Sequence, residues 1–300
     1  MLFQCHPNEI KNTKPISHDL LEEILLQLAI KNQERIESCE YAEYIWSSDV
    51  VEFVFNISEN MSLKRNVKYV ALEIYERFIA EHIVDVRRTH SDLLKTRKDS
   101  RWEMVEERIK EQSVLRIMTS IQLASKLESH YDHVLPPQVS QILEKVGKPY
   151  SLNGIFSSEL RILKTLNYKV NLTTPALYVE LLLYVLYTND PNIEEPLYDL
   201  TVTILDYVYL HRAQLYNELY NALGEDGNDM ERDFNQNFMK VKADYMLLAT
   251  SIIAATAYLF MNKCYELILE QLHQITRKVK ADMKTFSVVI AYVVMNDMVE

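Results

Sequence analysis

The stretch from Val114 to Leu127 reads VLRIMTSIQLASKL and is apolar on nearly every face when drawn as a helix. A helix on a protein surface keeps one polar face, whereas a helix that is apolar all round lies inside a bundle. The sequence therefore predicts a helix here with neighbours on all sides. The stretch from Tyr245 to Met261, YMLLATSIIAATAYLFM, has the same character and predicts a second central helix.

The two central stretches belong to segments that repeat at almost one spacing. TSIQLAS, beginning at Thr119, aligns with TSIIAAT, beginning at Thr250, at an offset of 131 residues. YERF, beginning at Tyr75, aligns with LDYV, beginning at Leu205, at an offset of 130 residues. Two similar offsets indicate a duplicated helical unit.

The link from Asn171 to Pro175 is the predicted boundary between the halves. Thr174 is a suitable N-cap and Pro175 suits the first helical position, so we expect a new helix to begin there. The predicted domains are an N-terminal region (1–45), a first domain (46–171) and a second domain (172–300).

Other segments have the helical period as well. Apolar residues recur at three- and four-residue spacing, and only four glycines are available for sharp turns, so we expect an all-α fold. The acidic stretch Gly224–Phe234 is predicted to be an exposed loop before the second central helix. The remaining predicted helices cover Ser17–Ser38 (amphipathic, N-terminal), Asp49–Glu59, Val67–Ile83 and Ser157–Leu166.

A basic stretch, residues 86–112, is predicted to be a surface insertion in the first domain. It holds few apolar residues, and its part from Arg87 to Arg101 has six basic and two acidic side chains. Two interpretations stay open: a solvated face or partly helical loop, and a contact with nucleic acid or an acidic protein. The basic contact residues would be Arg87, Arg88, Lys95, Arg97, Lys98 and Arg101.

Charge and motifs exclude several classes of function. The formal net charge of −11 argues against wrapping of a nucleic-acid backbone, which depends on clustered Lys and Arg. No phosphate-binding glycine loop, kinase motif, nucleophile elbow or HExxH zinc motif is present in the sequence. We therefore expect no enzymatic activity and no cofactor.

Cysteines, histidines and apolar runs add no further site. Cys5, Cys39 and Cys264 are odd in number and scattered, which fits reduced thiols in the nucleus or cytosol. His130 and His133 lack further ligands nearby, so a metal site is not expected. The uncharged run Tyr245–Asn262 is interpreted as a buried helix, and no membrane contact is expected.

Three blocks of sequence resemble the helices of a cyclin box. ALEIYERFI, from Ala71 to Ile79, resembles the second helix of the box, and IQLASKLE, from Ile121 to Glu128, resembles the third helix with its A-S-K-x-E signature. SELRILKTLNYKV, from Ser158 to Val170, resembles the fifth helix, and Pro175 opens a second box. The resemblance implies two tandem five-helix cyclin-box lobes preceded by an N-terminal helix.

Within the cyclins, the chain is most similar to a divergent branch that acts in meiotic crossing over, from about Glu22 to Val294. This resemblance implies a nuclear, chromosome-associated regulator that promotes crossovers by contacting meiotic recombination proteins. A link to a cyclin-dependent kinase is also implied. The reduced thiols are compatible with the cytosol as well.

The resemblance also implies positions for a partner contact. In cyclins that activate kinases, the lysine of A-S-K-x-E and a glutamate early in the fifth helix bind the backbone of the kinase, and Lys126 and Glu159 stand at those places. Glu128 completes the signature. The alternative is that Lys126 and Glu159 form an internal ion pair between two helices.

The substrate-docking patch departs from the cyclin pattern. Cyclins usually begin this patch with M-R-A-I-L, whereas this chain has WSSDV from Trp46 to Val50, and Leu127 replaces the usual aromatic residue after the lysine. Asp49 places a charge where an apolar contact is usual, and burying it unpaired would be costly. Conventional substrate docking is therefore not expected, and the partner-contact residues predicted here are Trp46, Val50 and Phe53.

Overall fold

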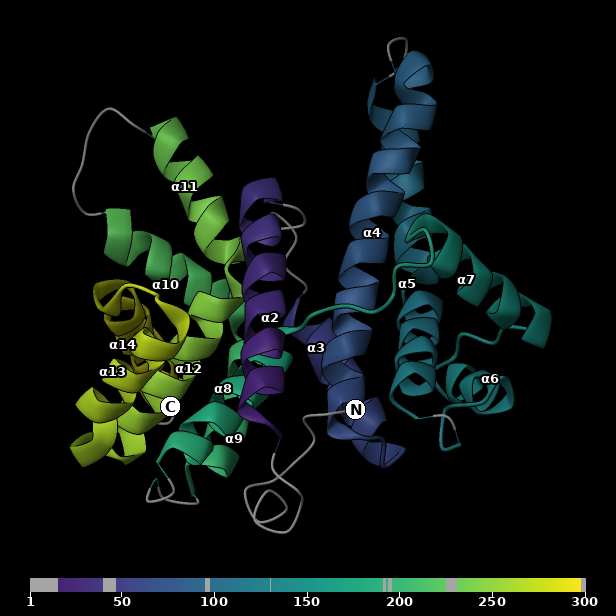
Figure 1. Ribbon diagram of the computed structural model, residues 1–300. Coiled ribbons are helices and arrows are strands. Elements are labelled where there is room, and N and C mark those ends of the chain that lie inside the picture. Colours follow the sequence, from purple (N-terminus) through teal and green to yellow (C-terminus); the bar gives the residue numbers. More distant parts are fainter. Residues whose placement is uncertain are drawn as a thin grey trace. The chain divides into compact units, whose positions relative to one another are not determined.

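The computed structural model describes residues 16–39, 47–94, 98–129, 131–190, 193, 196–224 and 231–297. Within these ranges the regular structure is helical and contains no strand, so the prediction of an all-α fold is confirmed (Figure 1). Contacts divide the chain into two units. We name Asp49–Leu172 the first unit, and Met1–Ser48 together with Thr173–Glu300 the second unit.

The first unit is built around helix α5, which contacts α4, α6 and α7. Met118, Ile121 and Ala124 on α5 have no exposed surface. Polar side chains between them are satisfied locally, because the Thr119 hydroxyl donates to the carbonyl of Leu115 at 2.7 Å. The helices of this unit are α3 (Ser48–Asn60), α4 (Arg65–Leu94), α5 (Lys98–Glu128), α6 (Pro136–Lys145) and α7 (Leu152–Thr165).

The basic stretch 86–112 is helical in the residues that the structure describes, 86–94 and 98–112. Helix α4 continues to Leu94 and α5 begins at Lys98, so the two helices run side by side well beyond the segments that apolar periodicity predicts (Figure 1). Arg, Lys and Glu are good helix formers even without a core to cover. That residues 86–112 form a surface insertion stays a prediction, and the partly helical form left open for this stretch is seen in its described residues.

The second unit is built around helix α12, which contacts α8, α9, α13 and α14. Every residue of α12 from Tyr245 to Ala257 is buried, as expected of a central helix. Among the described residues, no single helix has the length and apolar composition to cross a membrane, although the bent pair Phe234–Ala243 and Tyr245–Phe260 together does. The helices of this unit are α2 (His18–Ser38), α8 (Pro175–Asn189), α9 (Pro196–Leu210), α10 (Arg212–Gly224), α11 (Glu231–Ala243), α12 (Tyr245–Phe260), η1 (Asn262–Cys264), α13 (Tyr265–Thr276) and α14 (Lys280–Asp297).

Helix α8 begins where its capping residues predict. The Thr174 hydroxyl accepts a hydrogen bond from the amide of Leu177 at 3.2 Å, and Pro175 occupies the first turn, where its missing amide hydrogen costs nothing. The predicted loop Gly224–Phe234 is shorter than expected, because α11 already begins at Glu231. Aromatic residues of α10 and α11, including Tyr220 and Phe238, pack edge to face and favour this second helical pair.

The N-terminal helix α2 belongs to the second unit. Asn32 is 3% exposed; its side-chain amide donates to Asp244 Oδ1 at 2.8 Å and its oxygen accepts from the amide of Met246 at 3.1 Å. Arg35 donates to the hydroxyl of Tyr245 at 2.5 Å. Both residues of α2 therefore satisfy polar groups at the start of α12, and the helix completes the core of this unit.

Candidate functional site

The candidate site lies where the end of α5 meets α7 in the first unit. Ser151 caps α7 by accepting from the amide of Gly154 at 3.2 Å. Ile155, Ser158 and Ile162 are the buried residues of α7 and recur at three- and four-residue spacing, as on one face of a helix. This arrangement leaves the opposite face of α7 open to solvent.

Lys126 and Glu159 are brought together at the edge of this contact. The Lys126 Nζ lies 2.6 Å from Glu159 Oε1, and the two side chains are 34% and 15% exposed. The alternative of an internal ion pair between two helices is thus realised. Both charges still reach the surface, where an ammonium can donate to backbone carbonyls and a carboxylate can accept from amides of a partner.

An apolar stripe runs along the open face of α7 beside this ion pair. Leu152, Phe156 and Leu160 follow one another at one-turn intervals and are 44%, 51% and 46% exposed. Leu127, the neighbour of Lys126, is 45% exposed. Exposed apolar side chains grouped on a rigid helix are favourable to bury against a protein partner. We name these four residues and the ion pair the α5–α7 face.

Glu128 lies in the last turn of α5 and is half-buried. The ammonium of Lys64 donates to the backbone carbonyl of Glu128 at 2.9 Å. A lysine at this position interacts favourably with the negative end of the helix dipole. The end of α5 that carries Lys126 is therefore held to the segment between α3 and α4.

The predicted docking patch on α3 is only partly described. Val50 and Phe53 are half-buried, while Trp46 lies outside the described residues. Asp49 is exposed in the first turn of α3, where a negative charge is favourable at the positive end of the helix dipole. Asp49 is therefore placed to stabilise α3, and the loss of conventional substrate docking stays a prediction.

The predicted basic contact follows the long parts of α4 and α5. Arg87 and Arg88 lie on α4, of which Arg88 is exposed. Lys98 and Arg101 lie on the first turns of α5. Lys95 and Arg97 fall outside the described residues. Their contact with nucleic acid or with an acidic protein stays a prediction.

No metal-binding arrangement is found in the part of the chain that the structure describes, where no group of three His, Cys, Asp or Glu side chains is placed to hold an ion. Cys39 and Cys264 are free thiols. His133 precedes α6, and Cys5 and His130 fall outside the described ranges.

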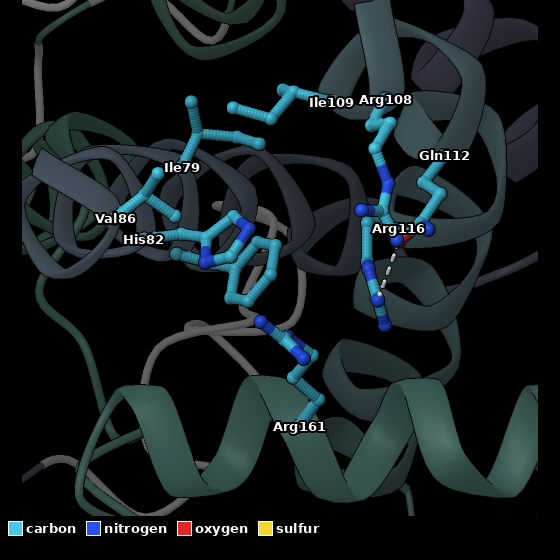
Figure 2. A pocket seen from close by; sticks show the side chains of 9 residues that line it. Ile79, His82, Val86, Arg108, Ile109, Gln112, Arg116 and Arg161 are labelled. Atoms are coloured by element: carbon cyan, nitrogen blue, oxygen red, sulfur yellow. Dashed lines mark hydrogen bonds between the residues drawn. The ribbon is translucent and has the colours of Figure 1, made fainter. Parts of the chain in front are cut away.

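A pocket between α4, α5 and α7 was not foreseen from the sequence (Figure 2). Its walls include His82, Arg116 and Arg161, which come from three different helices. The long gaps between these residues hide the cluster from any search for short motifs. Arginines spaced along one helix face would have pointed to such a pocket, but of the arginines that line it only Arg108 and Arg116 lie on the same helix.

Comparisons with known proteins agree with this architecture. Residues 46–171 match the family model described as "Cyclin, N-terminal domain". The chain is 34% identical to mouse cyclin N-terminal domain-containing protein 1 over 280 residues, which are 92% of this chain and 83% of the mouse protein. It is 32% identical to the human protein of that name over 279 residues, 92% of this chain and 84% of the human protein. The chain belongs to the family of cyclin N-terminal domain-containing protein 1.

Proposed function

We propose that this protein is a non-enzymatic, cyclin-like regulator or scaffold that promotes crossover formation in meiotic recombination through protein–protein contacts. The observation that carries the proposal is the extent of the similarity, which covers 92% of the chain and therefore both units rather than the cyclin domain alone. The chain would work in the nucleus on meiotic chromosomes. Its partners would be meiotic recombination proteins.

The α5–α7 face supports the proposal physically. It combines exposed apolar side chains, which are favourable to bury, with one charge of each sign that can pair with backbone groups of a partner. Lys126 and Glu159 are held together before binding, so little side-chain entropy is lost when a partner arrives. Such a face suits a binding module.

A conventional cyclin that binds and activates a cyclin-dependent kinase is the second candidate function. Lys126 and Glu159 support it, because the resemblance to cyclins implies that they stand where activating cyclins hold the kinase, and they lie 2.6 Å apart. The exposed Asp49 on α3 favours a kinase complex that lacks conventional substrate docking.

A variant in which the charges of Lys126 and Glu159 are exchanged tests partner binding without removing the ion pair between the two helices. In a Lys126→Glu, Glu159→Lys double variant, the two side chains can pair again with opposite polarity, while a partner meets the wrong charge at both places. The matched control is Glu144→Lys, Lys145→Glu on α6, where both side chains are exposed and the net charge is also unchanged. Purified cyclin-dependent kinases and meiotic recombination proteins are then tested for retention on each variant.

We expect the wild type and the control variant to retain recombination proteins, and the variant with the reversed pair to lose them. The same reversed pair, expressed in meiotic cells that lack the wild-type protein, should fail to restore the number of crossovers. Retention of an active kinase by the wild type, without any effect of the variants on crossovers, would instead support the conventional cyclin. Full crossover numbers with the reversed pair would refute the role of this face.

A further inference from the structure

The pocket between α4, α5 and α7 has a volume of about 230 Å³ and lies within the first unit. Its basic side chains come from all three helices: His82 from α4, Arg108 and Arg116 from α5, and Arg161 from α7. Figure 2 shows Arg161 reaching from α7 toward His82, with Arg116 to the right of both. Apolar residues of α4 and α5, among them Ile79, form the rest of the wall.

Positive charge in this pocket is not balanced by the residues that line it. Among the described residues, the lining contains no carboxylate, and none of its three arginines forms an ion pair. Arg116 is 9% exposed, and its guanidinium donates only to neutral oxygens, Ser158 Oγ at 2.7 Å and Gln112 Oε1 at 2.9 Å. A buried cation without a counter-charge is costly unless an anion arrives to pair with it.

Burial and the neighbouring positive charges both lower the pKa values of Arg116 and His82. Burial, and next the charge of Arg161, lower the pKa of Arg116 to about 10, which still leaves it charged at neutral pH. Burial first, and then Arg161 and Arg116, lower the pKa of His82, against an opposite effect of Asp85. A bound anion would raise the pKa of both groups.

We propose that this pocket binds the phosphate group of a phosphorylated side chain in a partner protein. Guanidinium groups bind phosphate oxygens through paired, charge-assisted hydrogen bonds, and three arginines from two helices line this one pocket, where they can approach a single dianion. The apolar wall beside them suits a residue that flanks the phosphorylated one. Nucleic acid is disfavoured, because it needs a track of positive charge and the whole chain carries −11.

This phosphate pocket goes beyond the proposed function and is separate from the α5–α7 face. Arg116 precedes Lys126 by ten residues on one helix, which is roughly 15 Å along its axis. Arg161 and Glu159 are two residues apart on α7, so their side chains point to different sides of the helix. A partner could therefore occupy either site alone.

Fluorescence polarisation on the full chain tests the proposal. The probe is a labelled peptide mixture with a fixed phosphoserine between degenerate positions, and the reference is the same mixture with serine. The test variant is Arg108→Glu, Arg161→Glu, because both side chains are exposed and their replacement spares the core. The control, Lys110→Glu, Lys164→Glu, changes two exposed lysines on the same two helices and alters the net charge equally.

We expect the phosphorylated mixture to bind at least about tenfold more tightly than the serine mixture, with inorganic phosphate as a competitor. The arginine variant should weaken binding by roughly 100-fold, and the lysine control by less than about threefold. Equal binding of the two mixtures would overturn the proposal, as would an equal loss in both variants. Displacement of the probe by a single-stranded oligonucleotide, but not by inorganic phosphate, would overturn it in favour of a nucleic-acid site.

Discussion

Replacing Asn32 with alanine should loosen the second unit by removing the link between α2 and α12. The change deletes a hydrogen bond to the Asp244 carboxylate at 2.8 Å and leaves the buried amide of Met246 without the oxygen that accepts from it at 3.1 Å. A bond to a charged group contributes about 1.5–3 kcal/mol and a neutral one about 0.5–1.5 kcal/mol. The expected loss in the free energy of unfolding is therefore roughly 2–4.5 kcal/mol.

Hydrogen exchange measured on peptides from α12, supported by urea denaturation, gives this loss for the second unit rather than for the whole chain. The control is Gln33→Ala, the next residue of α2, whose exposed side chain bonds only to Glu37, at 2.9 Å. Its effect should stay within about 0.5 kcal/mol. A loss below about 1 kcal/mol for Asn32→Ala, or equal losses for both variants, would refute the assignment of α2 to this core.

The remaining predictions concern the first unit. Ile121→Asp should abolish the cooperative melting of the first unit in calorimetry, because Ile121 has no exposed surface and its burial alone contributes about 1.5–3 kcal/mol. An unchanged melting temperature would contradict the central position of α5. The pKa of the His82 imidazole, measured by NMR, should lie below 6.5, so the stability that the neutral imidazole contributes is lost as the pH falls below 6.5. Arg161→Gln should raise this pKa, and an unchanged pKa in that variant would show that Arg161 does not act on His82. A double-mutant cycle of Lys126→Ala and Glu159→Ala should give a coupling of about 0.5–2 kcal/mol in denaturation, whereas zero coupling would mean the contact at 2.6 Å adds no stability.

Helices with strong apolar patterns were predictable from the sequence, and helices without them were not. The central parts of α5 and α12 and the start of α8 at Pro175 follow from burial pattern and capping chemistry alone. Helix α6 was not among the predicted helices, since Pro136 and Pro137 would break a helix in its interior. A proline in the first turn begins a helix instead, and the Gln138 side chain supports it by accepting from the amide of Leu135 at 2.8 Å.

The α5–α7 face and the phosphate pocket also differ in how far the sequence alone predicts them. The resemblance to cyclins pointed to Lys126 and Glu159 because both lie in short motifs, although it left open whether they would meet. The phosphate pocket depends on the packing of α4, α5 and α7, and His82, Arg116 and Arg161 are too far apart in the sequence to form a short motif. Only the tertiary arrangement shows that their charges gather in one place.

The attachment of α2 to the second unit also affects how the chain is made. Asn32 and Asp244 are 212 residues apart, so at a synthesis rate of about 5–20 residues per second the N-terminal helix waits roughly 10–40 s for its partner to leave the ribosome. During that time its buried face, which includes Leu21 and Leu28, is open to chaperones or to other nascent chains. A protein fragment truncated before α12 would leave this face of α2 permanently exposed, and such a fragment should be found in aggregates or bound to chaperones.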